Sequence, residues 1–205
     1  MLKIYLARHG QDQDNVRGIL NGHRDEPLTA LGENQAQELA QKIKTANIKF
    51  DKIYSSPLIR TTRTAEIVAD ALSMDKPEPM PLLIERDFGI MTGKPTAELE
   101  SLCAPNILKT DTITYILSPE GAETFPQLMV RAHQILEKIK TNHQDGNILL
   151  VTSGDIGKMI YASYYNLYWK EVLTMFHFGN SELLLLANDS PAENAHVFKT
   201  EKFNH

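Results

Sequence analysis

The chain is short of cysteine, of net positive charge and of long apolar runs. Cys103 is the single cysteine among 205 residues, so no internal disulfide can form and a reducing, cytoplasmic compartment is expected. The net charge of −5 argues against a nucleic-acid-binding surface, which needs a basic patch. No apolar run approaches the roughly 18 residues that cross a membrane. The amino terminus runs straight into an apolar segment, so we expect no signal peptide.

Signatures of metal and nucleotide binding are also missing. The seven histidines show no metal-ligand spacing, and the sequence has no glycine-rich nucleotide loop. We therefore expect no metal and no other cofactor. A hydrophobic fraction of 42% is nevertheless typical of a globular protein with a sizeable core.

Apolar segments of strand type and of helix type alternate along the chain. Strands are predicted at 2–7, 53–55, 82–84, 147–152 and 183–187. Helices are predicted to start after Thr29, Ser56-Pro57 and Ser153, and two more are predicted near 96–102 and over 123–141. This alternation predicts a three-layer α/β/α fold with a mostly parallel central sheet. We expect one domain, in which the proline-rich residues 74–122 form a cap insertion, and a loosely held tail from Asn188.

Polar residues follow three of the predicted strands. These are Arg8-His9-Gly10, Arg60 in the next helix, and Ser153-Gly154. Because the carboxyl ends of parallel strands share one edge of a sheet, these groups are expected to meet there. Two arginines and a helix amino terminus suit a dianion such as a phosphoryl group. His9 then has the chemistry of a base or nucleophile, and Glu85 that of a proton donor.

Five ordered motifs together resemble the histidine phosphatase superfamily, the phosphoglycerate mutase-like proteins. They are Arg8-His9-Gly10 with Asn15, Asp25-Glu26-Pro27-Leu28-Thr29 with Gly32, Ser55-Ser56-Pro57-Leu58-Ile59-Arg60 with Thr64-Ala65, Glu85-Arg86-Asp87-Phe88-Gly89 with Gly93-Lys94, and the strand Ile148-Leu149-Leu150-Val151-Thr152. The resemblance covers nearly the whole chain to about residue 187.

The resemblance implies hydrolysis of a small phosphorylated substrate through a phosphohistidine on His9. Arg8 and Arg60 would hold the phosphoryl oxygens, and Glu85 would protonate the leaving oxygen and then help to activate water. Contacts to the phosphate or the substrate would come from Asn15, Asn21, Gly22, Ser153 and Gly154. A phosphoglycerate mutase is the less favoured alternative, because residues 74–122 look short for the insertion that true mutases carry.

One position departs from the family pattern. The resemblance places a second catalytic histidine where this chain has Ser153, and Asp155 follows as a helix cap or as extra negative charge. Three explanations stay open: a weak or altered phosphatase, a degenerate relative that binds a phosphorylated ligand without turnover, and an engineered substitution. His23 and His177 are conceivable substitutes, although an ordinary loop or sheet-edge role is favoured for both. An aromatic cluster over 161–169 suits a core or a subunit contact, which leaves a homodimer open.

Overall fold

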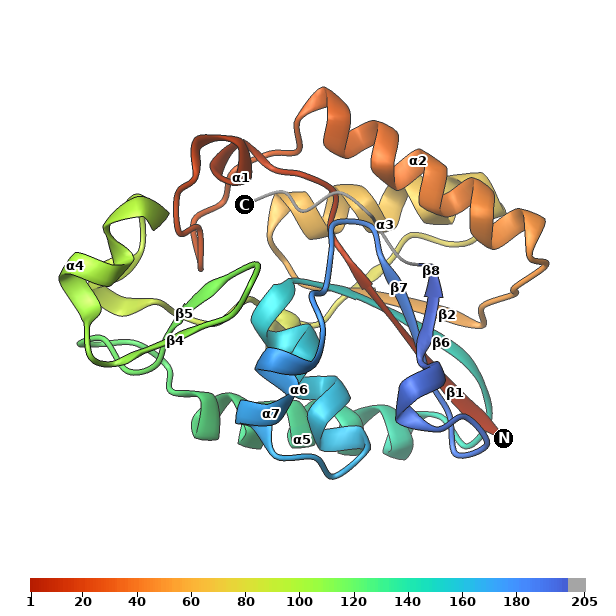
Figure 1. Cartoon of the computed structure of the whole chain (residues 1–205). Helices are drawn as coiled ribbons and strands as arrows, with labels where there is room; N and C mark the ends of the chain where they lie inside the picture. Colours follow the sequence, from red (N-terminus) through yellow and green to blue (C-terminus); the bar gives the residue numbers. More distant parts are fainter. Residues whose placement is uncertain (199–205) are drawn as a thin grey trace.

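A six-stranded sheet forms the centre of the molecule in the computed structural model, which describes residues 1–198 (Figure 1). The strand order is β3-β2-β6-β1-β7-β8. The strands are β1 (Leu2–Arg8), β2 (Lys52–Ser55), β3 (Glu78–Pro79), β6 (Gly146–Thr152), β7 (Leu183–Leu186) and β8 (His196–Phe198). The first four in this list run parallel, whereas β7 is antiparallel to β1 and β8 is antiparallel to β7. The prediction of a mostly parallel sheet is therefore confirmed.

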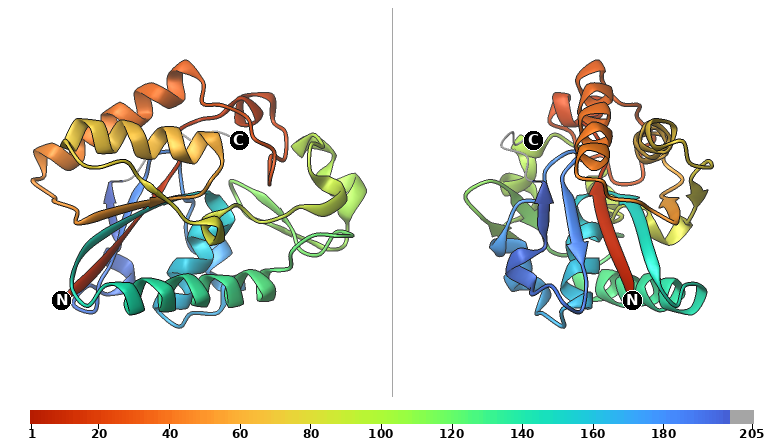
Figure 2. Two further views of the ribbon diagram at one scale, coloured as in Figure 1. Left: turned by 180° about the vertical axis from the view of Figure 1, so that it is seen from behind. Right: turned by 90° about the vertical axis from the view of Figure 1, so that its right-hand side faces the viewer.

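Helices cover both faces of the sheet, as Figures 1 and 2 show. One face carries α2 (Ala30–Thr45) and α3 (Ile59–Leu72), and the other carries α5 (Phe125–Asn142), α6 (Gly154–Tyr164) and α7 (Trp169–Met175). Successive strand residues point to opposite faces. Tyr5 and Ala7 of β1 accordingly pack in the core beneath α2 and α3, whereas Ile4 and Leu6 pack in the core beneath α5 and α6. The predicted three-layer fold is confirmed.

The remaining elements are short and lie mainly at one end of the molecule (Figures 1 and 2). They are α1 (Gln13–Arg17), the 3-10 helices η1 (Pro81–Leu83), η2 (Gly89–Met91) and η3 (Thr96–Glu98), α4 (Leu99–Cys103), the hairpin strands β4 (Ile107–Lys109) and β5 (Thr114–Ile116), and η4 (Ala192–Asn194). The hairpin is separate from the central sheet, whereas β3 within the predicted cap segment 74–122 belongs to it. That residues 74–122 act as a cap of a single domain stays a prediction.

Three local predictions are wrong. The strand predicted at 82–84 is the 3-10 helix η1, because Pro81 fixes the first helical position and cannot donate to a sheet. The helix predicted from Ser56-Pro57 begins at Ile59, since Ser56 Oγ accepts from the Leu58 N–H in a preceding turn. The tail after Asn188 is not loose over its described part, because β8 pairs with β7. Residues 199–205 lie outside the described residues.

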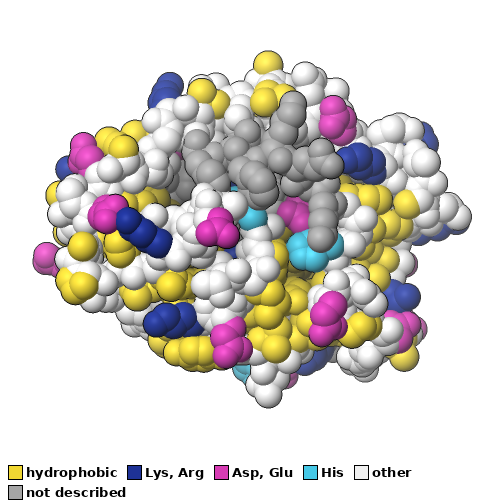
Figure 3. Space-filling view, viewed as in Figure 1, with side chains coloured by type: hydrophobic (Ala, Val, Ile, Leu, Met, Phe, Trp, Pro, Cys, Tyr) yellow, Lys and Arg dark blue, Asp and Glu magenta, His cyan; other side chains and the backbone are white. Residues whose placement is uncertain are grey.

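Charged side chains of both signs are interspersed over the face shown in Figure 3. Among the described residues, no helix is both long enough and apolar enough to cross a membrane.

Candidate active site

His9 lies where β1 ends, beside the end of β6. Its backbone N–H donates to the Thr152 carbonyl at 3.0 Å, and the Asn180 Nδ2 donates to the His9 carbonyl at 2.9 Å. The side chain is buried, and Nδ1 lies 2.7 Å from the Gly10 carbonyl. Because a carbonyl oxygen can only accept, Nδ1 carries the hydrogen of the neutral ring. The lone pair is therefore on Nε2.

The surroundings of His9 keep its imidazole neutral. Burial lowers the pKa of His9 well below its ordinary value, and the positive charges of Arg60 and Arg8 lower it further. The hydrogen bond to Gly10 opposes these effects without reversing them. A neutral imidazole with a lone pair on Nε2 is the form that can attack phosphorus.

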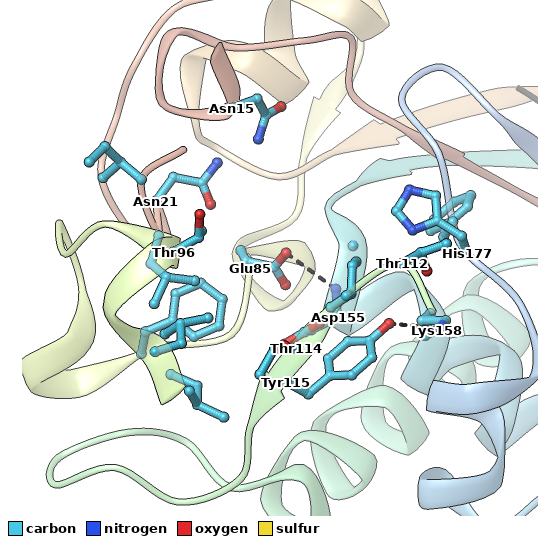
Figure 4. Close-up of a pocket in the computed structure, with 18 of the residues that line it drawn as sticks. Asn15, Asn21, Glu85, Thr96, Thr112, Thr114, Tyr115, Asp155, Lys158 and His177 are labelled. Carbon is cyan, nitrogen blue, oxygen red and sulfur yellow. Dashed lines mark hydrogen bonds between the residues drawn. The ribbon is translucent and has the colours of Figure 1, made fainter. Parts of the chain in front are cut away.

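Arg8, the residue before this histidine, lines a cavity of about 380 Å³, which Figure 4 shows. Its walls bring together five of the residues predicted for the site: Arg8, Asn15, Asn21, Glu85 and Gly154. The other four predicted residues, His9, Gly22, Arg60 and Ser153, are buried and do not line the cavity. Apolar side chains from the β4–β5 hairpin, α4 and the 19–20 segment form the opposite wall. The structure thus gathers the predicted residues around one place, and their chemical roles stay predictions.

Arg60 is fully buried and holds the loop that carries Asn21. Its Nη1 donates to the Arg24 carbonyl at 2.7 Å and its Nη2 to the Gly22 carbonyl at 2.8 Å, while Nε lies 3.4 Å from Asp12 Oδ2. Asp12 Oδ2 also accepts from Asn21 Nδ2 at 2.7 Å. One buried ion pair therefore fixes both the guanidinium near His9 and the loop that borders the cavity.

Glu85 occupies the amino terminus of α6. Its Oε1 accepts from the backbone N–H groups of Arg86 at 2.8 Å and Ile156 at 3.2 Å, and its Oε2 accepts from the N–H of Asp155 at 3.2 Å. The sequence predicts that this helix end donates to a phosphoryl group. In the structure two of its N–H groups donate instead to the protein's own carboxylate.

The side chains of Arg8 and Glu85 both lie close to Gly154. A Cβ built on Gly154 would lie 3.7 Å from Arg8 Cζ and 3.7 Å from Glu85 Oε2. Arg8 Nη1 donates to the Phe178 carbonyl at 2.6 Å, while its buried Nε has no hydrogen-bond partner among the described residues. A donor is thus left for a bound anion.

Ser153 and His9 each follow one of two paired strands. Arg8 pairs with Thr152 in the β1–β6 register, so the residues directly after the two strands are His9 and Ser153. Ser153 is the N-cap residue of α6, but its side chain makes no capping bond. Its buried Oγ has no hydrogen-bond partner among the described residues. Replacing Ser153 would therefore break no hydrogen bond of its hydroxyl to the described residues.

Comparison with known proteins decides the family. Residues 4–194 match the family model of the histidine phosphatase superfamily (branch 1). The chain belongs to this superfamily. A probable phosphoglycerate mutase GpmB of Escherichia coli O1:K1 is 36% identical over 159 residues, which cover 75% of this chain and 70% of that protein.

Other superfamily members match over shorter stretches. A probable phosphoglycerate mutase GpmB of Proteus mirabilis is 43% identical over 101 residues, which are 49% of this chain and 46% of that protein. A broad-specificity phosphatase of Saccharomyces cerevisiae is 35% identical over 105 residues, 49% of this chain and 44% of that protein. The matched stretch thus spans about half the length of these two relatives. Curated relatives of the chain are phosphatases or phosphoglycerate mutase-like enzymes.

Solved structures share the fold over almost the entire chain. Bacillus stearothermophilus YhfR has a TM-score of 0.79 at 22% identity, covering 98% of this chain and 96% of that one. A phosphoserine phosphatase of Entamoeba histolytica, solved with 3-phosphoglyceric acid, has a TM-score of 0.73 at 26% identity and covers 90% of both chains. Structural neighbours therefore include a protein that binds a small phosphorylated acid.

The two histidines named as conceivable substitutes for the superfamily's second histidine lie in different places. His23 is exposed, and its Nε2 hydrogen-bonds the Glu85 carbonyl at 2.8 Å. His177 lines the cavity next to Phe178, the residue whose carbonyl binds Arg8. His177 is thus the one of these two residues that borders the pocket.

Sequence reasoning missed one polar residue of the cavity wall and left the role of another open. Asp155 was expected either to cap α6 or to add negative charge, and its carboxylate lies 3.3 Å from Arg86 Nη1. Lys158 is buried, and its Nζ donates to Tyr115 Oη and to the Leu173 carbonyl, both at 2.9 Å (Figure 4). A lysine among the apolar residues 156–162 is the signal that could have identified it, because a charge on a buried helix face needs a partner.

Proposed function

We propose that the chain is a phosphomonoester hydrolase that works through a phosphohistidine on His9. The observation that carries this proposal is the neutral, buried imidazole with a lone pair on Nε2, close to the positive charges of Arg8 and Arg60 and adjacent in sequence to Arg8 of the cavity wall. Phosphoryl transfer requires positioning and stabilisation of charge more than any other form of assistance. This arrangement of one nucleophile and two guanidinium groups supplies both.

In the first step, His9 Nε2 forms a bond to phosphorus as the bond between phosphorus and the ester oxygen breaks. The leaving oxygen takes a proton from a carboxyl group of the pocket, a role that the family resemblance assigns to Glu85. Water then attacks the phosphohistidine, giving up a proton to the carboxylate and releasing phosphate and His9. The residues that we propose to hold the phosphoryl oxygens or the substrate are Arg8, Asn15, Asn21, Gly22, Arg60, Ser153 and Gly154.

A second candidate function is binding of a phosphorylated ligand without turnover. Ser153 favours it, because the neutral hydroxyl stands where the resemblance expects a histidine beside His9. A phosphoglycerate mutase-like phosphotransferase is the remaining alternative, and it has support from the names of the relatives. We also propose that residues 74–122 act as a cap that sets substrate choice, and that the protein works in the cytoplasm without a cofactor.

Hydrolysis of p-nitrophenyl phosphate by the wild type, His9→Ala and His133→Ala tests the proposal. His133 is an exposed histidine on α5, so its replacement is a matched control. We expect turnover by the wild type and the control, and its loss in His9→Ala. Phosphate release that is equal in all three proteins would contradict the mechanism. An inert wild type that binds vanadate would instead favour the binding function.

A further inference from the structure

Two carboxyl groups lie side by side in the pocket, and their surroundings differ. Glu85 follows η1, and Asp155 lies in the first turn of α6 (Figure 4). They are linked directly, because the backbone N–H of Asp155 donates to Glu85 Oε2 at 3.2 Å. Both line the cavity, so both can reach a bound ester. A reaction that needs one proton therefore has two candidate carriers.

Glu85 is held as an acceptor. Three backbone N–H groups point at its two oxygens, from Arg86, Asp155 and Ile156. Hydrogen bonds of this kind stabilise the ionised form of a carboxyl group, and the positive end of the α6 dipole acts in the same sense. Both carboxylate oxygens of the residue to which the resemblance assigns the proton are therefore already hydrogen-bond acceptors.

The surroundings of Asp155, in contrast, favour the protonated form of its carboxyl group. The nearby charged groups on the surrounding elements are Glu85, Arg86, Lys158 and Arg8, and Tyr115 is the neutral titratable group on the hairpin. Burial and the negative charge of Glu85 raise the pKa of Asp155 to about 6, although the three cations lower it. Arg86 lies 3.3 Å from Oδ2, and the side chain remains 13% exposed. Two neighbouring carboxylates resist double ionisation, so a single proton is favoured at Asp155, which accepts from Arg86, rather than at Glu85, which accepts from three backbone N–H groups.

We infer that Asp155 is the catalytic acid and base of this enzyme, with Glu85 as the fixed negative charge that keeps the proton on Asp155. The inference rests on the proposed function. As His9 Nε2 bonds to phosphorus, the Asp155 carboxyl gives its proton to the departing oxygen. In the second step the Asp155 carboxylate takes a proton from the attacking water, and the phosphorus–nitrogen bond breaks. The acid is thereby restored, and one ester and one water become one alcohol and one phosphate.

Asp155→Asn tests the inference with two esters that differ in their need for a proton. The p-nitrophenolate ion leaves without protonation, whereas the strongly basic alkoxide of butyl phosphate needs an acid. The second step is common to both esters, so the comparison uses kcat/KM, which reports the first step. We expect kcat/KM for butyl phosphate to fall by at least about 10²-fold, and kcat/KM for p-nitrophenyl phosphate by much less. A residue that only positions Arg86 would affect both esters equally, and an equal fall would overturn the inference.

Asp87→Asn is a matched control for this test. Asp87 accepts from the Gly89 N–H at 2.8 Å and does not line the cavity, so an amide oxygen can take over its role. Its ratio of the two activities should equal that of the wild type. If the wild type hydrolyses neither ester, the proposed function itself is wrong. If the wild type is active and Asp155→Asn keeps both activities, the inference about Asp155 is wrong and the proposed function stands.

A measurement on the unmutated protein covers the case in which Asp155→Asn does not fold. The ¹³C resonance of the Asp155 carboxyl is followed from pH 3 to 8 in the wild type and in Glu85→Gln. We expect a midpoint near 6 in the wild type, as its surroundings indicate, and a lower midpoint in Glu85→Gln. A wild-type midpoint near the ordinary aspartate value would overturn the inference.

Discussion

Ser153→His should convert the site into a faster phosphatase. The register places residue 153 beside His9, and the serine hydroxyl has no partner that the replacement would break. Ser153 also makes no side-chain bond to the amino terminus of α6, so the helix does not depend on the hydroxyl. An imidazole at this position would add a donor, and a positive charge when protonated, next to the phosphoryl group.

The size of the gain follows from the value of one preorganised donor in a transition state. Such a donor is worth about 10²–10³ in rate, or roughly 2.7–4 kcal/mol. Arg8 and Arg60 disfavour a second positive charge, whereas the carboxylates of Glu85 and Asp155 favour it, so the new group stands among charges of both signs. We therefore expect kcat for p-nitrophenyl phosphate to rise by about 10²-fold.

Steady-state kinetics together with urea unfolding provide the assay. A large rise in kcat with little change in KM is expected, because the added donor acts mainly on the transition state. Ser163→His, at a half-buried position later in α6, is a control for the addition of a histidine to the same helix. A folded Ser153→His variant with unchanged kcat would refute the reasoning, and would show that the serine is not the element that limits the rate.

Two further predictions concern stability. Burial lowers the pKa of Lys158 from 10.5 to about 8, so the unfolded chain binds more protons between these values and stability rises with pH there. Lys158→Met lacks this rise. Urea unfolding from pH 7 to 10.5 should therefore show the unfolding free energies of wild type and variant diverging by about 1.4 kcal/mol per pH unit, or ~3 kcal/mol in all. Parallel plots of unfolding free energy against pH would contradict the assignment. Gly10→Ala should cost about 1–3 kcal/mol, because its Cβ would lie 2.2 Å from the Gly32 carbonyl oxygen. Gly154→Ala, whose Cβ meets nothing nearer than 3.7 Å, should keep its thermal midpoint.

The layers of the fold could be predicted because the spacing of hydrophobic residues indicates which segments form strands and helices. The continuous apolar run of β1 corresponds to a strand that is buried on both faces, and the helical spacing of apolar residues in α2 and α5 corresponds to the buried faces of those helices. The predicted cap of α2 is also confirmed, since Thr29 Oγ1 accepts from the Gly32 N–H. The run 82–84 was misread, because a short apolar stretch fits a strand and a helical turn equally well.

The candidate site could be predicted in part. Arg8, Glu85 and Gly154 follow strands or match motifs, and all three reach one cavity. The spacing of residues along the sequence does not reveal contacts between segments that are far apart in the chain. The pairing of Arg86 with Asp155 was missed for this reason. Neither periodicity nor motif could indicate that the N–H groups of α6 are already engaged by Glu85.

The carboxylate seated on the amino terminus of α6 has a consequence for inhibitor design. A tetrahedral dianion in the cavity meets both the guanidinium of Arg8 and the carboxyl groups of Glu85 and Asp155. An aminoalkyl phosphonate places its anion toward Arg8 and His9 and its ammonium toward Glu85 and Asp155. Such a zwitterion should compete with substrate more strongly than the corresponding alkyl phosphonate, and most strongly above pH 6, where Asp155 is charged.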